Sequence, residues 1–365
     1  MEEKAATGKF KGDRVIWTVF FFLCIISIIE VFSASSNLSF KSGNYLGPVL
    51  KHVMLLVVGV MAMIATMNVK CKYFKMVTPG ALIISFIGLI AVLCFGESTN
   101  GSQRWLSVMG IQFQPSELAK GAIILATAQI LSAMQTPTGA DKRAFKYICI
   151  VCAFIVPLIM VENLSTAVLL CTVVFLLMFI GKGPKAQLGR LLGIVMLCLI
   201  FIVSMVMILG HDKEKENADG QKMAMTEQVE KKDETVVEKV FHRFDTWKAR
   251  IDKFLDNKEI APEEVDLDKD GQIAHANIAI ASSNVVGKGP GNSVERDFLS
   301  QAFSDFIYAI IIEEMGIAGA AFVCLLYIIL LFRTATIANR CVNTFPALLI
   351  MGFALLLVIQ AMFNM

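Results

Sequence analysis

The sequence predicts an all-α protein that crosses a membrane about nine times, with a large polar segment outside the membrane between its seventh and eighth helices. Composition is the first reason: 56% of the 365 residues are apolar, 18% are charged and the mean hydropathy is +0.66. Soluble domains carry about a quarter charged residues, so the excess of apolar side chains must face lipid. Apolar runs long enough to span a bilayer and an alternating distribution of Lys and Arg are the second and third reasons.

Each predicted membrane helix is an apolar run close to the roughly 20 residues that a bilayer core requires. A signal peptide would be one short apolar run with a small-residue cleavage site, whereas this run is the first of many, so we interpret it as a retained helix. The runs are Val15–Ser33, Pro48–Met67, Met76–Phe95, Glu117–Met134, Phe145–Val161, Leu164–Gly181, Leu188–Leu209, Phe306–Phe332 and Phe345–Phe363.

Lys and Arg occupy every second connection. Basic residues precede the first helix and follow the second, fourth, sixth and eighth, whereas the opposite short connections hold little beyond Lys41 and Arg104. Because basic loops stay in the cytoplasm, the N-terminus is predicted to be cytoplasmic. The chain then divides into helices one to seven (1–209), an extracytoplasmic segment (210–303) and helices eight and nine (304–365).

The extracytoplasmic segment contains one amphipathic pattern, near residues 236–255. Val240, Phe244, Trp247 and Ile251 recur at spacings of three and four, which is typical of a helix lying on a membrane surface. We favour a lid or brace over direct substrate contact. Further on, the acidic run 266–271 resembles the start of a calcium loop, but the twelfth position is Asn277 instead of Glu, so an acidic turn is predicted.

Two function classes are disfavoured by the sequence. The net charge of +2 argues against a nucleic-acid partner, because such proteins concentrate basic residues on one face. Cys149 and Cys152 form a CxxC pair inside an apolar run without nearby His, so buried thiols are favoured over a redox or zinc site.

Ionisable residues within or beside the membrane helices are costly and are therefore candidates for function. Glu117 and Lys120 are three residues apart and share a helix face; they are either an ion pair that lets both charges enter the bundle, or part of a cavity that binds an anionic head group. Asp305, between two phenylalanines at the start of the eighth helix, is either a base or an N-cap of that helix.

Two blocks of sequence resemble the SEDS family, the FtsW and RodA proteins of bacterial cell division and elongation. The first combines GSQRWL at 101–106 with FQPSELAK at 113–120. The second runs from GKGPGNS at 287–293 through SDFI at 304–307 to EEMG at 313–316. The resemblance extends from the first helix to the last residue, and both blocks occur in the family's order.

The resemblance implies a peptidoglycan glycosyltransferase that polymerises lipid II at the outer face of the cytoplasmic membrane. Asp305 matches the family's essential acidic residue, Glu117 and Lys120 match its polar pair, Arg104 matches the Arg of its RW pair, and Lys51 resembles a basic position in the second helix. It further implies lipid II and undecaprenyl-pyrophosphate-linked glycan as ligands, and a class B penicillin-binding transpeptidase and other division proteins as partners. No cofactor is implied with certainty; a divalent cation is an alternative source of positive charge.

The GPGNSVER stretch resembles FtsW more than RodA, which favours a role at the division septum over elongation. Two other readings remain: a flippase that moves lipid II without chemistry, and a scaffold that only binds the transpeptidase. The chain departs from the family at Phe303-Ser304, where His-Thr is common, and at Glu162, where many relatives have Pro. The family also has a tenth helix, whereas this sequence ends as the ninth closes, and on this basis the sequence is expected to be one helix short.

Overall fold

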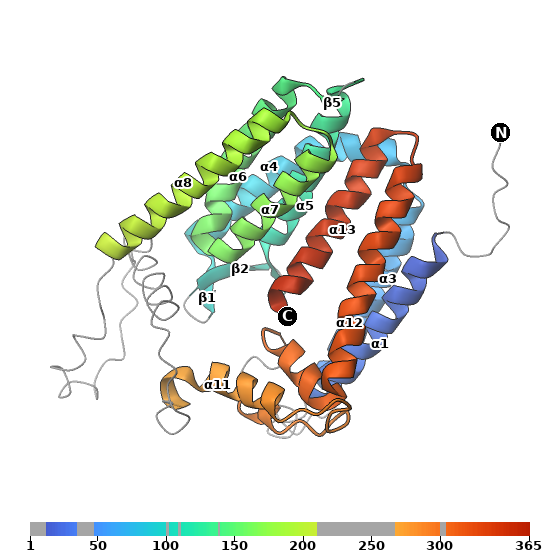
Figure 1. The fold of residues 1–365 in the computed structure, drawn as a ribbon, viewed down its shortest axis with the longest axis vertical. Coiled ribbons are helices and arrows are strands. Elements are labelled where there is room, and N and C mark those ends of the chain that lie inside the picture. Colours follow the sequence, from blue (N-terminus) through green and yellow to red (C-terminus); the bar gives the residue numbers. More distant parts are fainter. Residues whose placement is uncertain are drawn as a thin grey trace.

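The computed structural model describes residues 12–34, 47–99, 102–108, 111–137, 139–209, 267–299 and 304–365. Within these ranges the fold is a bundle of long helices (Figure 1). The long helices that match the predicted runs are α1 (Arg14–Ala34), α3 (Gly47–Met67), α4 (Cys71–Phe95), α5 (Pro115–Ala133), α6 (Lys142–Glu162), α7 (Leu164–Ile180), α8 (Lys185–Leu209), α12 (Ile307–Arg340) and α13 (Thr344–Asn364).

Every apolar run predicted from the sequence coincides with one of these helices. Among the described helices, α1, α3, α4, α6, α12 and α13 are long and apolar enough to cross a membrane, and α7 is a shorter apolar helix. The predicted fold class, an all-helical polytopic membrane protein, is therefore confirmed. The eighth predicted run is longer than expected, because α12 continues to Arg340.

Local sequence explains several helix boundaries. The Asp141 carboxylate accepts a hydrogen bond from the Arg143 N–H at 2.7 Å and begins α6. Asn163 accepts from the N–H groups of Ser165 and Thr166 and begins α7 directly after α6 ends. Such side chains satisfy N–H groups that have no partner within the helix.

Helix α5 lies at the centre of the larger part of the bundle and packs against α4, α6, α7 and α13 (Figure 1). Its Ile123, Ile124 and Leu131 are fully buried with Leu170 and Leu177 of α7. A second cluster joins α1 to α12 through Val19, Ile26, Ile311, Val323 and Leu326. The smaller helix group is completed by α3, which packs on α1.

The connection before α5 contains a small sheet that the sequence analysis did not predict. Strands β1 (Glu97–Thr99), β2 (Ser102–Val108) and β3 (Ile111–Phe113) pair antiparallel in the order β1-β2-β3. A shorter pair, β4 (Gln135–Thr136) and β5 (Gly139–Ala140), joins α5 to α6 at the opposite end of the bundle (Figure 1).

The polar segment before α12 also differs from the prediction. Helix α11 (Leu267–Ala281) runs through the acidic stretch, so the predicted acidic turn is wrong for residues 267–271. The residues that follow α11 make a looped segment, which contains the short 3₁₀ helix η1 (Glu295–Asp297) and contacts α12 (Figure 1). The amphipathic helix predicted near residues 236–255 lies outside the described residues.

Candidate active site

The structure joins Glu117 and Lys120 on the first two turns of α5. Lys120 Nζ lies 2.8 Å from Glu117 Oε2 and donates a hydrogen bond to Gln360 Oε1 at 2.9 Å. The Lys120 side chain is 2% exposed and that of Glu117 is 51% exposed. The buried Lys120 ammonium group is therefore held between an exposed carboxylate and an amide of α13. This is the ion pair that the sequence analysis gave as its first alternative for these two residues.

Arg104 belongs to the sheet that leads into α5. Its backbone is part of β2, which pairs with β3 immediately before Gln114 and Pro115. The position of the Arg104 side chain lies outside what the structure describes. Strand β2, which carries Arg104, contacts α5 and is joined through β3 to the first turn of that helix.

Asp305 lies in the turn that precedes α12 and is exposed. The N-cap residue of α12 is Phe306, and no side-chain hydrogen bond caps this helix among the described residues. The N-cap reading of Asp305 thus finds no support in this geometry. An exposed carboxylate at the mouth of a membrane helix is accessible to a substrate hydroxyl.

Two glutamates of α12 anchor the segment that precedes Asp305. Glu313 and Glu314 are fully buried. Glu313 accepts hydrogen bonds from Lys288 Nζ at 2.6 Å, from the Val294 N–H at 3.1 Å and from the Ser293 hydroxyl at 2.5 Å. The segment 287–295 is thereby fixed against the first two turns of α12.

Glu314 extends this anchor to α1. It accepts from the Gly291 N–H at 2.9 Å, from the Ser293 N–H at 3.3 Å and from the hydroxyl of Ser33, with Arg296 Nη1 3.8 Å away. Arg296 also donates to the Ser33 hydroxyl at 2.9 Å. The EEMG and GKGPGNS blocks are thus one structural unit, whose contacts reach Arg296, nine residues before Asp305.

The backbone of this unit requires glycine at two facing positions. Gly316 interrupts α12 with φ 70° and ψ −178°, and Gly287 has φ 77°. A Cβ atom on Gly316 would lie 2.4 Å from the carbonyl oxygen of Val285, and one on Gly287 would lie 2.3 Å from the Gly316 nitrogen. Positive φ and such close approach together exclude side chains here.

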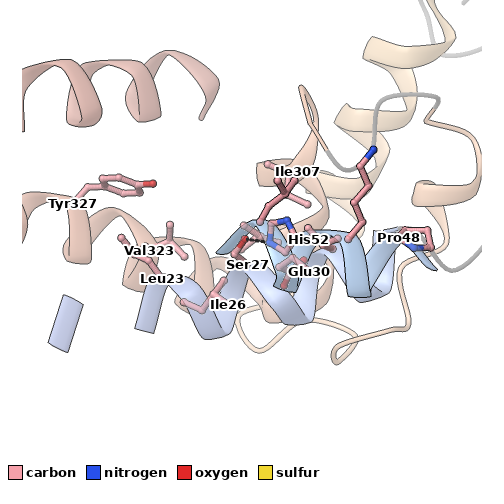
Figure 2. Close-up of a pocket in the computed structure, with 13 residues that line it drawn as sticks. Leu23, Ile26, Ser27, Glu30, Pro48, His52, Ile307, Val323 and Tyr327 are labelled. Carbon is pink, nitrogen blue, oxygen red and sulfur yellow. Dashed lines mark hydrogen bonds between the residues drawn. The ribbon is translucent and has the colours of Figure 1, made fainter. Parts of the chain in front are cut away.

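Lys51 lies in a different place from Glu117 and Lys120. It lines a cavity of about 540 Å³ formed by α1, α3 and the N-terminal part of α12. Figure 2 shows Ser27, Glu30 and His52 in this cavity, with the hydrogen bond of 2.9 Å between the Ser27 hydroxyl and His52 Nε2. Neither residue of the α5 pair lines it.

Several polar residues of these sites were missed by the sequence analysis. Glu30 is 1% exposed, and neither of its oxygens has a hydrogen-bond partner among the described residues. It could have been found as an acid inside an apolar run. Gln360 carries no such signal, because it meets Lys120 only through the packing of α13 on α5.

A second missed contact lies beneath the turn of Asp305. His275 of α11 lies 2.6 Å from Glu295 and stacks on Phe298 at 4.7 Å between ring centroids. This contact holds α11 to η1 and fixes the chain seven residues before Asp305.

Among the described residues, no three His, Cys, Asp or Glu side chains gather as a metal site requires, so the divalent cation stays a prediction.

The fold and these sites define a polytopic helical membrane protein whose polar motifs include the Glu117–Lys120 pair and the buried glutamates of α12. Residues 13–365 match the FtsW, RodA and SpoVE family of cell cycle proteins, and the chain belongs to this family. The predicted family is confirmed.

Curated relatives carry both names. The peptidoglycan glycosyltransferase MrdB of Escherichia coli K12 is 26% identical over 367 residues, covering 99% of this chain and 85% of its own length. The probable peptidoglycan glycosyltransferase FtsW of Aromatoleum aromaticum is 26% identical over 356 residues, covering 94% and 76%. These names give the enzyme class that the sequence predicted.

Solved structures agree with the fold. A chain of a peptidoglycan synthase complex that coordinates polymerization and crosslinking superposes with a TM-score of 0.65 at 19% identity, covering 97% of this chain and 86% of that one. The rod shape determining protein RodA of Thermus thermophilus gives a TM-score of 0.58 at 17% identity, covering 98% and 85%. At this identity the likeness supports the fold alone.

Proposed function

We propose that this chain is a peptidoglycan glycosyltransferase that polymerises lipid II at the outer face of the cytoplasmic membrane, with Asp305 as its base. The proposal rests on one contrast. Asp305 is exposed, whereas Glu313 and Glu314 of α12 are buried and hydrogen-bonded to the segment that they anchor. The anchor fixes residues 287–296 against α12, and the Asp305 carboxylate is exposed.

The reaction joins two sugars. The Asp305 carboxylate takes the proton of the acceptor hydroxyl, whose oxygen then forms a bond to the anomeric carbon of the donor sugar. The bond between that carbon and the lipid pyrophosphate breaks, and the pyrophosphate leaves with the electron pair. Negative charge therefore develops on the leaving group and is stabilised by fixed cations.

Lys120 and Arg104 are the cations that we assign to this charge. An ammonium group has three donors, and two of those of Lys120 are accounted for by Glu117 and Gln360. We assign the third to a phosphate oxygen that reaches this buried side chain when substrate is bound, while Glu117 orients the ammonium group. Lys51 stays outside this catalytic group, because it lines the cavity with Glu30.

The proposal includes the orientation and the setting. The N-terminus lies in the cytoplasm, and residues 210–303 with the end of the bundle that carries Asp305 lie outside. The partner is a class B penicillin-binding transpeptidase, and the site of action is the division septum, with RodA-type elongation as the alternative. Imaging of a fluorescent fusion separates these two, because septal synthesis concentrates the protein at mid-cell.

The test is polymerisation of purified lipid II by the full chain with its transpeptidase partner, read as glycan products on a gel. Asp305→Asn should lower the rate by a factor of about 10²–10⁴, the usual contribution of a positioned base. The matched control is Asp297→Asn, an exposed acid on the same segment, which should keep the wild-type rate. Full activity of Asp305→Asn would contradict the proposal and favour the flippase or scaffold reading.

A further inference from the structure

The cavity between α1, α3 and α12 combines an apolar wall with groups of both charges. Its apolar lining includes Leu23, Ile26, Leu55, Val323 and Tyr327. Its polar lining is Ser27, Glu30, Lys51 and His52 (Figure 2). A volume of about 540 Å³ is within the range of sites that bind small molecules.

Glu30 is the feature that the fold does not explain. Its side chain is 1% exposed, and both oxygens are without a hydrogen-bond partner among the described residues. Its neighbour Glu314, in contrast, receives all its hydrogen bonds from the anchor segment and Ser33. A buried carboxyl group without partners costs free energy, and acids inside membrane helices mark ligand sites by default.

The polar groups of the cavity lie close to the described ends of α1 and α3. Glu30 is four residues before the end of α1 at Ala34, and Lys51 is four residues after the start of α3 at Gly47. At a rise of 1.5 Å per residue, each lies about 6 Å inside its helix end. Leu23, Leu55 and Tyr327 lie further along their helices, toward the bilayer centre, where a hydrocarbon chain would run.

We infer that this cavity binds a phospholipid whose head group carries both a phosphate and a primary ammonium, such as phosphatidylethanolamine. The phosphate lies against Lys51 and His52. The ammonium donates hydrogen bonds to the two Glu30 oxygens, which have no other donor in the described structure, and an acyl chain lies along the apolar wall. This site is separate from the proposed glycosyltransferase site and does not depend on it.

The N–H groups of the ammonium make the inference testable. Phosphatidylcholine has the same charges but no N–H donor, and phosphatidylglycerol has the phosphate without the ammonium. The full chain, purified in detergent and stripped of lipid, is mixed with equal amounts of the three lipids, and bound lipid is counted by native mass spectrometry. Wild type should retain phosphatidylethanolamine about ten-fold over phosphatidylcholine, the effect of about one charge-assisted hydrogen bond.

Two variants locate the binding. Glu30→Gln keeps the shape of the side chain and removes the charge, and should reduce the ten-fold preference to about one. Leu55→Trp, on an exposed surface of α3 that lines the cavity, should fill the mouth and abolish retention without disturbing the core. The matched control is Leu197→Trp on α8, exposed and outside this cavity, which should bind as wild type.

Three results would overturn the inference. Equal retention of all three lipids would show general solvation by lipid. An unchanged preference in both Glu30→Gln and Leu55→Trp would place the lipid elsewhere. A preference for phosphatidylglycerol over phosphatidylethanolamine would show that Lys51 and His52 select an anion without help from Glu30.

Discussion

Glu314 and Glu30 are buried carboxyl groups on packed neighbouring helices, and their surroundings are opposite. Glu314 accepts hydrogen bonds from Gly291, Ser293 and Ser33, with Arg296 nearby. Glu30 has no hydrogen-bond partner within the described structure. This difference indicates that the two acids have different roles. A carboxyl group whose oxygens are fully hydrogen-bonded is typical of a structural anchor, whereas a buried carboxyl group without partners is typical of a site that a ligand completes.

The largest expected effect comes from breaking the saturated acid. Glu314→Ala leaves the Gly291 and Ser293 N–H groups and the Ser33 hydroxyl without their acceptor and removes the carboxylate beside Arg296, and should lower the free energy of unfolding by about 3–5 kcal/mol. Hydrogen exchange in detergent should show the loss first in residues 287–296. Glu314→Gln, which keeps the shape and one acceptor, should lose less. Unchanged protection of residues 287–296 in Glu314→Ala would show that Glu314 does not anchor this segment.

The next effect tests the backbone on which the anchor depends. Gly316→Ala places a Cβ 2.4 Å from the Val285 carbonyl oxygen at a φ of 70°, and should cost about 2–3 kcal/mol. Gly193→Ala is the control, because a Cβ there meets nothing within 4 Å on α8. A melting temperature of Gly316→Ala equal to that of the control would contradict the tight approach of Gly287 and Gly316.

The unsatisfied acid should respond in the opposite direction. Glu30→Leu removes a buried polar group with no partner, and in lipid-free detergent should raise the free energy of unfolding by about 1–2 kcal/mol. Added phosphatidylethanolamine should then stabilise wild type but not this variant. A destabilisation as large as that of Glu314→Ala would show that Glu30 is also an anchor, and the comparison between the two acids would fail.

The sequence predicted those parts of the molecule that depend on local pattern. Apolar runs placed every described helix that is long and apolar enough to cross a membrane, and the spacing of three between Glu117 and Lys120 predicted a shared helix face, with an ion pair as one of two readings. Gln360 was missed because it is 240 residues from Lys120. The Glu30 cavity was missed for the same reason, since three helices distant in sequence must pack before Lys51 and Glu30 line one space. Helix α11 was not predicted, because its first residues are acidic and its apolar character is weak.

The smallest expected effect on stability comes from the ion pair between Asp13 and Arg333, near the other end of α12. Arg333 donates to both Asp13 oxygens, at 2.7 Å from Nη2 and 3.0 Å from Nε. Asp13 also accepts from the N–H of Val15 at the start of α1. The hydrogen bond from Arg333 is the main cause that lowers the pKa of Asp13 below its ordinary value.

A lowered pKa in the folded state means that the Asp13 contribution is present above the ordinary pKa of an aspartate, near 3.9, and is lost as the pH falls through the folded value. Asp13→Asn should therefore lower the melting temperature by no more than about 2 °C at pH 7, because both side chains are partly exposed. The difference from wild type should shrink as the pH is lowered below that ordinary value. A difference that persists there would mean that Asp13 acts through its bond to Val15 and not through Arg333, so that this end of α12 is fixed by helix capping instead of charge.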